Sequence, residues 1–198
     1  MTKSRSSGHH ASVDERAVVL VAGLSDRIAV EALAEGRGRD LSAEGISVVA
    51  MGCAQAIGRV LLRVGPRGLD LRLAGLCDAG EEEVVRRALE RAGLGSFGLT
   101  RADMEALGFY VCVEDLEDEL IRSVGAGRVE RILEAEGDLG SFRTLQKQAV
   151  WRGRGVEEQL RRFMGSGGSR KVRYARLLVE ALEPARVPRP LDRVLAHV

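Results

Sequence analysis

Apolar runs and amphipathic stretches alternate along the chain as far as residue 124. Four short apolar runs predict buried β-strands, at residues 17–21, 46–51, 71–76 and 109–113. A stretch with helical spacing follows each run; after the second, Ile57, Leu61 and Val64 fall on one helix face. This alternation predicts an α/β fold with a mainly parallel, Rossmann-like sheet flanked by helices and joined by right-handed crossovers.

Beyond Gly125 the pattern becomes entirely helical. Five helical segments are expected, at residues 128–136, 141–148, 156–164, 171–182 and 191–197. The first residues are polar, Ser-rich and aperiodic, which is typical of disorder. We therefore expect three parts: a disordered tail over 1–14, an α/β domain over 15–124 and a helical C-terminal extension over 125–198.

Bulk composition limits the class of protein without specifying its function. The chain has 198 residues, 45% of them hydrophobic but only 4% aromatic, so an aliphatic core is expected. Its three cysteines lack the spacing of a structural zinc site, and we expect them to be small buried residues. With no signal peptide and no apolar run of membrane-spanning length, a cytoplasmic location is expected.

Charge is placed unevenly, although the formal net charge is only +1. Residues 103–119 contain seven acidic residues and no Lys or Arg, whereas residues 143–176 contain ten basic residues against Glu157 and Glu158. An acidic centre beside a basic arm suits a metal-dependent enzyme that acts on a polyanion. The alternative is that these charges are solvated helix faces.

Acidic side chains follow three of the expected strands. Asp26 lies just after the first strand, Asp78 directly after the third, and Glu117 within an acidic cluster after the fourth. Parallel strands end at one edge of a sheet, and carboxylate oxygens there can hold Mg²⁺ or Mn²⁺ for phosphodiester cleavage. The alternative is helix capping, with these acids stabilising helix N-termini.

The order of four segments resembles a known domain. VLVAGLSD, VVAMGCAQAIGR, LAGLCDAGEE and YVCVEDLEDELI are similar to the Toprim domain, and most similar to the form at the carboxyl end of OLD (overcoming lysogenisation defect) family nucleases. The resemblance covers about residues 17–122 and is weaker in the helical extension. It implies Mg²⁺- or Mn²⁺-dependent cleavage or transfer at DNA phosphodiesters.

The resemblance also implies a ligand set for the metal. Asp26 matches an acid that the OLD form adds after its first strand, and Asp78 matches the first Asp of the Toprim Asp-x-Asp pair. Glu82 stands where a further acid is expected, and Glu117 matches a later acidic ligand. These four side chains are therefore the expected metal ligands.

Two positions depart from the Toprim pattern. Ala22 stands where the pattern has a glutamate that acts at the catalytic centre, and Gly80 stands at the second Asp of the pair. Alanine can neither coordinate a metal nor act as a general base. A catalytically weakened enzyme, or a site with fewer ligands, is the expected consequence.

The helical extension supplies the expected contacts to phosphate. Lys171, in SRKVRYA, is the preferred match to the catalytic lysine of the OLD form, which stabilises charge on the phosphate; Lys147 is the other candidate. Arg143, Lys147, Arg170 and Arg173 are expected to hold the DNA backbone.

Partners and rival functions follow from what the sequence lacks. OLD nucleases carry an amino-terminal ATPase, but this sequence has no GxxxxGK[ST] and cannot supply a P-loop itself. A separate ATPase is therefore one expected partner. One rival function is a non-catalytic Toprim-derived module that binds DNA or such a partner. Another is a small nucleotide-binding protein, which the absence of GxGxxG spacing disfavours.

Overall fold

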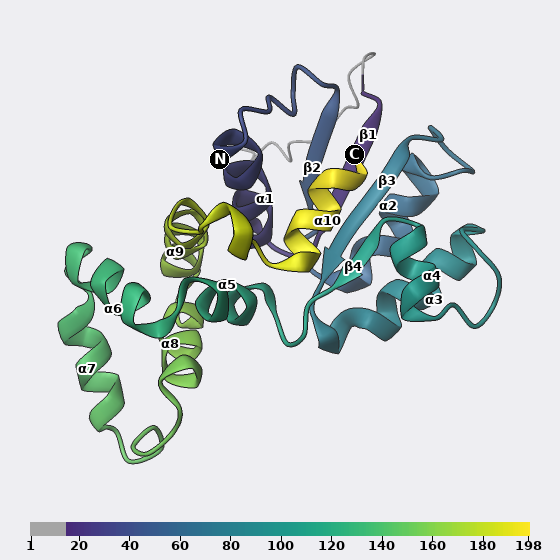
Figure 1. The fold of residues 1–198 in the computed structure, drawn as a ribbon. Coiled ribbons are helices and arrows are strands. Elements are labelled where there is room, and N and C mark those ends of the chain that lie inside the picture. The colour runs from purple at the N-terminus through teal and green to yellow at the C-terminus, as the bar shows by residue number, and fades with distance from the viewer. Residues whose placement is uncertain (1–14) are drawn as a thin grey trace, which may run out of the picture.

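The computed structural model describes residues 15–198, so the tail expected over residues 1–14 lies outside the described residues. Its centre is a parallel sheet in the order β2-β1-β3-β4 (Figure 1). The strands are β1 (Ala17–Val21), β2 (Ile46–Ala50), β3 (Arg72–Cys77) and β4 (Phe109–Val111). The α/β fold with a parallel sheet is confirmed.

The strand register places the segments that follow the strands at one edge of this sheet. Val21, the last residue of β1, lies opposite Ala50 of β2 and Leu76 of β3. Cys77, the last residue of β3, lies opposite Val111, the last residue of β4. The segments that leave β1, β3 and β4 therefore start from the same carboxyl edge.

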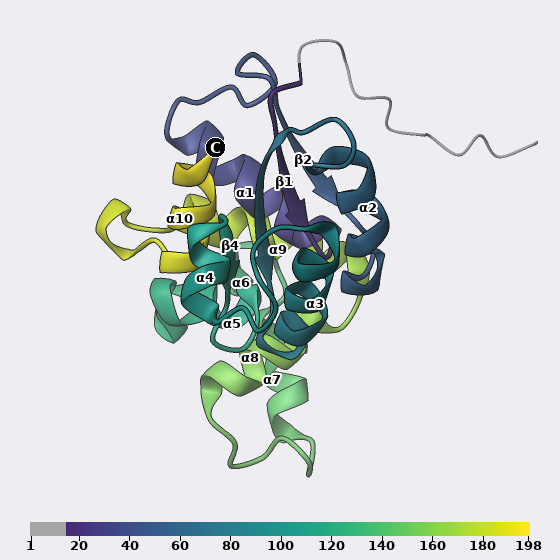
Figure 2. The same cartoon turned by 90° about the vertical axis from the view of Figure 1, so that its right-hand side faces the viewer.

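Helices cover both faces of the sheet (Figures 1 and 2). On one face, Val18 and Leu20 pack into a core with the short helices that precede β4: α2 (Ile57–Val64), α3 (Glu82–Ala92) and α4 (Arg101–Ala106). On the other face, Val19 and Val21 share a core with α1 (Leu24–Gly36), α5 (Leu116–Val124), α9 (Gly168–Glu180) and α10 (Arg189–His197). Alternate residues of β1 thus face opposite cores, as a strand requires.

The helical extension has two different roles in this architecture. Helices α6 (Ala126–Ala135), α7 (Leu139–Lys147) and α8 (Val156–Gly165) form a lobe beyond the carboxyl ends of the strands (Figures 1 and 2). Helix α9 then returns to pack along α1, and α10 packs against β3 and β4. Tyr174 and Leu191 consequently share a core with Val19 of the central strand.

Local differences from the sequence expectations have packing reasons. Strand β4 ends at Val111 rather than Val113, because the Val113 N–H donates to the buried Glu119 carboxylate at 2.9 Å. Cys77 and Cys112 are buried free thiols as expected, but Cys53 is exposed. Across the described residues, no helix is both long and apolar enough to span a membrane.

A close contact between β3 and β4 requires glycine at residue 75. A Cβ atom added to Gly75 would lie 2.4 Å from Cδ1 of the Phe109 ring, and Phe109 is itself buried. Buried rings in a packed core have little room to move away from such an atom.

We therefore expect Gly75→Ala to lower the free energy of unfolding by about 1–3 kcal/mol, because the ring and strand must shift. Gly58→Ala is the matched control: Gly58 lies inside α2 with nothing within 4 Å of its added Cβ, so this change should be neutral or stabilising. Urea unfolding of both variants measures the effect. Equal stabilities would contradict the contact between β3 and β4.

Candidate active site

The turn after β1 holds Asp26 in a fixed position. Gly23 is the extended N-cap of α1, and its N–H donates to Asp26 Oδ2 at 2.8 Å. The Ser25 hydroxyl lies 3.4 Å from Asp26 Oδ1, and Asp26 is only 9% exposed. Its carboxylate therefore caps the helix, as the capping alternative proposed, and at the same time lies buried at the carboxyl edge of the sheet.

Asp78 leaves β3 at the same edge. It precedes a short 3₁₀ helix, Ala79–Glu81, and its N–H donates to Glu81 Oε2 at 3.3 Å. The next residue ties this turn to the end of β4, because the Ala79 N–H donates to the Glu114 carbonyl at 2.9 Å. Asp78 is thus also the N-cap of a short helical turn. A backbone hydrogen bond fixes the position of this turn beside the segment that follows β4.

Helix α5 supplies the third acidic segment. Asp115 is its N-cap and accepts a hydrogen bond from the Asp118 N–H at 2.8 Å. Two residues later, Glu117 is buried, with 7% of its surface exposed. Lys171, from the first turns of α9, places its Nζ 3.2 Å from Glu117 Oε2.

Burial and mutual repulsion act on all three carboxyl groups. Burial, followed by the negative charges of Asp26, Glu81, Asp115 and Glu117, raises the pKa of Asp78 to about 7. Burial also raises the pKa of Asp26 and of Glu117 above the ordinary range, although Lys171 opposes both shifts. The edge therefore holds more negative charge than its surroundings neutralise.

Lys171 is the cation that partly compensates this charge. Burial disfavours its charged form, but Glu117, Asp26 and Asp78 together raise the pKa of its ammonium group above the ordinary value. Lys171 thus interacts with all three acids, which come from the ends of β1 and β3 and from α5. The structure brings together Asp26, Asp78, Glu117 and Lys171.

The donor chemistry of this edge suits a divalent cation. Carboxylate oxygens are the ligands that Mg²⁺ and Mn²⁺ prefer, and the surplus negative charge would be relieved by a second cation. Within residues 15–198, however, no three His, Cys, Asp or Glu side chains already stand in an arrangement that could hold a metal ion. Asp26, Asp78 and Glu117 fit the ion in donor type and charge, and their side chains would have to close around it.

Glu82 is turned away from this group. Its carboxylate pairs with Arg101 of α4, with Arg101 Nε 3.3 Å from Oε1, and this pairing lowers the pKa of Glu82. The charges that act on Glu82 are those of Arg101 and Arg86, not those of the buried acids. Glu82 therefore forms an ion pair on the α3–α4 side of the sheet and does not lie among the other expected metal ligands.

Ala22 and Gly80 leave the site without the two carboxylates that the Toprim pattern has there. Ala22 directly follows β1, and Gly80 lies inside the 3₁₀ turn after Asp78, with nothing within 4 Å of an added Cβ. Glu81 and Asp115 are the acids whose charges join the group instead.

Most of the basic residues expected to hold DNA pair within the chain. Arg143 Nη2 lies 2.9 Å from Glu130 Oε2, and Arg173 pairs with Asp138 and Glu136. Arg170 stacks 4.2 Å above the Phe163 ring and donates to the Ser166 hydroxyl at 3.0 Å. Lys147 is exposed at the end of α7, and its ammonium has no acidic partner in the described part of the chain.

Arg161 is a site residue that the sequence did not single out. From α8 it donates to Asp115 Oδ2 at 2.7 Å, and it lies 3.7 Å from Glu114 Oε2. Asp115 was visible as part of the acidic cluster after the fourth strand, but its contact with α8 joins segments far apart in the sequence. No sequence signal marks that pairing.

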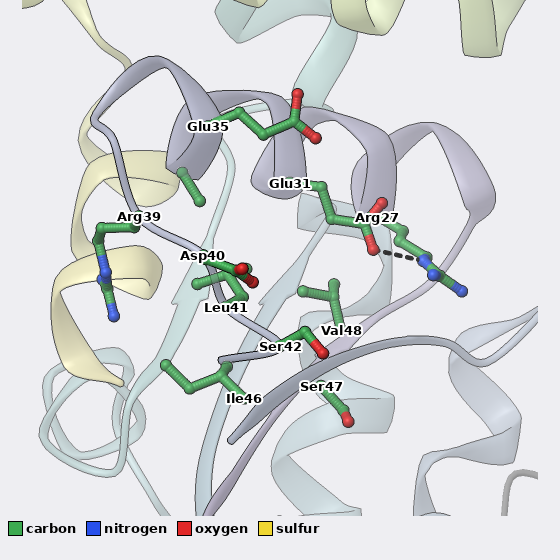
Figure 3. A pocket seen from close by; sticks show the side chains of 11 residues that line it. Arg27, Glu31, Glu35, Arg39, Asp40, Leu41, Ser42, Ile46, Ser47 and Val48 are labelled. Carbon is green, nitrogen blue, oxygen red and sulfur yellow. Dashed lines mark hydrogen bonds and ion pairs between the residues drawn. The ribbon is translucent and has the colours of Figure 1, made fainter. Parts of the chain in front are cut away.

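A separate hollow lies beside α1 and the edge strand β2 (Figure 3). Its volume is about 270 Å³, and its wall includes Glu35, Asp40, Ser42 and an Arg27–Glu31 ion pair of 2.8 Å. None of the acids of the carboxyl edge lines it. The hollow is therefore distinct from the acidic site.

Comparison with known proteins identifies the fold. No protein-family model and no curated protein matches the sequence. The C-terminal region of the Xanthomonas campestris pv. campestris OLD protein is similar, at 26% identity and a TM-score of 0.70, over 93% of this chain and 92% of that one. The C-terminal region of the Burkholderia pseudomallei OLD protein is similar at 21% identity and a TM-score of 0.69, over 92% and 96%.

These matches define the class of fold. The parallel sheet with acids at its carboxyl edge has a nuclease-like Toprim fold, as in the C-terminal region of OLD proteins. In particular, the chain is similar in structure to the C-terminal region of OLD proteins over 92–93% of its length. The match therefore extends into the helical extension, where the resemblance in the sequence is weaker.

The raised pKa of Asp78 predicts how stability depends on pH. Between the ordinary value of 3.8 and about 7, the folded protein holds a proton on Asp78 that the unfolded chain releases. The Asp78 contribution to stability is therefore lost as pH rises through this window. Asp78→Asn should flatten the fall, as measured by thermal unfolding in EDTA from about pH 4 to about pH 8.

Glu82→Gln serves as the control for this titration, because the pKa of Glu82 is lowered by Arg101 rather than raised. It should leave the fall in stability in place. A profile that Asp78→Asn does not alter would show that Asp78 ionises normally in the folded protein.

Proposed function

We propose that this domain carries out divalent-metal-dependent cleavage or transfer at DNA phosphodiesters. The observation that supports the proposal is the group of buried and half-buried carboxyl groups at the carboxyl edge of a Toprim fold, where desolvation and mutual repulsion raise the pKa of Asp78 to about 7. Buried charges that repel one another carry a stability cost, which a bound cation would remove. Such an arrangement is more typical of a functional site than of a structural one.

The residues of the edge would divide the work between metal and phosphate. Asp26, Asp78 and Glu117 would hold Mg²⁺ or Mn²⁺. A bound ion of this kind activates water and stabilises the leaving oxygen of a phosphodiester. Lys171, now 3.2 Å from Glu117, would direct its ammonium group to the phosphate once the metal neutralises that carboxylate.

Ala22 supports a second candidate function. It places a methyl group where the Toprim pattern has a catalytic glutamate, and the acids of residues 15–198 do not already form a closed set of metal ligands. Both observations favour a non-catalytic module that binds DNA or a partner protein. A partner ATPase, which the OLD resemblance implies, is one candidate for that protein.

Metal binding is the first test of the proposal. We expect Mn²⁺ to bind by calorimetry, and Asp78→Asn to weaken binding roughly tenfold or more, because a ligand is removed. Glu82→Gln is the matched control: it removes a nearby carboxylate that pairs with Arg101, so it should leave Mn²⁺ affinity unchanged. Equal affinity for all three proteins would place the metal elsewhere or exclude it.

Restoring the missing carboxylate tests whether the site is catalytic. Ala22→Glu should tighten Mn²⁺ binding and raise nicking of supercoiled plasmid, since the new side chain starts at the end of β1 beside Asp26 and Asp78. Adding Asp78→Ala should abolish the gain, and EDTA should abolish nicking throughout. A folded Ala22→Glu protein that neither binds Mn²⁺ more tightly nor nicks would favour the non-catalytic module.

A further inference from the structure

The basic arm of residues 143–176 contains few cations that are free to meet a phosphate. Ion pairs with Asp or Glu engage Arg143, Arg154, Arg161, Arg170, Lys171, Arg173 and Arg176. Lys147, Arg152 and Arg162 are the exceptions, with no such partner in the part of the chain that the structure describes. The available positive charge is therefore at the α7–α8 connection and on α8, not at the start of α9.

The connection between α7 and α8, residues 148–155, has the sequence QAVWRGRG and forms the tip of the helical lobe. In Figures 1 and 2 this tip lies at the end of the molecule furthest from the sheet. Val150 is 67% exposed, Arg152 is exposed, and Trp151, the only tryptophan of the chain, is half-buried. A half-buried indole beside unpaired, exposed cations combines two groups that recognise nucleic acid.

The tip is held in one conformation by hydrogen bonds. The buried Gln159 side chain donates to the Trp151 carbonyl at 2.8 Å and accepts from the Gln146 amide at 2.7 Å. The Arg152 guanidinium donates to the Lys147 carbonyl at 3.1 Å. A loop that exposes such side chains yet is fixed by a buried amide has its binding groups ordered in advance.

The indole ring is also fixed. The Arg154 guanidinium carbon lies 5.1 Å from the centre of the Trp151 ring, and Arg154 in turn pairs with Glu158 and donates to the Val150 carbonyl at 2.9 Å. Arg154 is thereby used within the tip, which leaves Lys147 and Arg152 as its free charges.

Helix α8 connects the tip with the acidic edge. It begins at Val156, and Arg161, which contacts Asp115, follows one and a half turns later. The rise of an α-helix puts Gly155 and Arg161 about 9 Å apart along the axis. Arg162, the third unpaired cation, is exposed on the same helix. A strand held at the tip could therefore reach the carboxyl edge along α8.

We propose that the tip binds an unpaired nucleic-acid strand, with Trp151 stacked on a base and Lys147 and Arg152 neutralising phosphates. The inference rests on the proposed function and specifies its substrate as a strand with exposed bases. A stacking indole requires a base that is not already stacked in a duplex, which favours single strands or frayed ends over intact double helix. The apolar residues at the tip are only Ala149, Val150 and Trp151, which offer too little apolar surface to favour a membrane.

Trp151 itself reports on binding, because no other tryptophan contributes to the emission. In EDTA, an oligothymidine strand should quench Trp151 fluorescence in a saturable way, whereas a blunt duplex of the same length should quench it far less. Trp151→Ala should weaken oligothymidine binding, followed by anisotropy of a labelled strand, roughly 5- to 100-fold, and Trp151→Phe should retain most of it. Circular dichroism confirms that both variants are folded.

Charge is tested separately by the salt dependence of the same binding. Replacing Lys147 and Arg152 together by Ala should lower the log–log salt slope by about 1.4, because each phosphate contact on a single strand contributes about 0.7. Arg131→Ala is the matched control: it removes an exposed positive charge from α6 of the same lobe and should leave the slope unchanged.

The inference would be overturned if oligothymidine left Trp151 emission unchanged, or if only anionic lipid vesicles changed it. It would also be overturned if Arg131→Ala lowered the salt slope as much as the Lys147 and Arg152 double variant. Because the measurements are made in EDTA, they do not depend on the metal site. Binding without Mn²⁺ affinity or nicking would refute the catalytic proposal alone, and nicking without binding at the tip would refute this inference alone.

Discussion

Burial of several carboxyl groups at one edge of the sheet is the constraint on which this structure depends. Asp26 and Asp78 are brought there by strands that run in the same direction, and Glu117 by the helix after β4. Ionised carboxylates in such a place repel one another and lose hydration, which is costly unless a cation is near. Helix α9 supplies Lys171, so its packing against α1 also compensates charge.

The sheet and the main acidic group could be predicted from the sequence because both follow from local patterns. Apolar runs predict strands, and parallel strands end at a common edge, so Asp26 and Asp78 had to approach one another. The fate of Glu82 could not be predicted in this way. It depends on how α3 is rotated and on Arg101, which a separate segment of chain brings to it.

The basic arm shows the same limit on a larger scale. The charge of the arm was visible in the sequence. Its ion pairs were not, because the acidic partners of Arg161, Arg173 and Arg176 lie in distant segments. Likewise, helical spacing in the extension predicted helices but not that α9 and α10 would complete a face of the sheet. Exposed charge in a sequence is thus a poor guide to charge available for binding until its partners are known.

The late position of Lys171 has a consequence for synthesis of the protein. The acids at the ends of β1 and β3 leave the ribosome well before this lysine, which follows Glu117 by roughly fifty residues. At about 5–20 residues per second, these fifty residues alone take about 3–10 seconds. Any sheet that forms during that time has an anionic edge without Lys171, so protons or ambient cations must supply the counter-charge. Translation speed through the α6–α8 lobe therefore sets how long the emerging domain remains in this high-energy state.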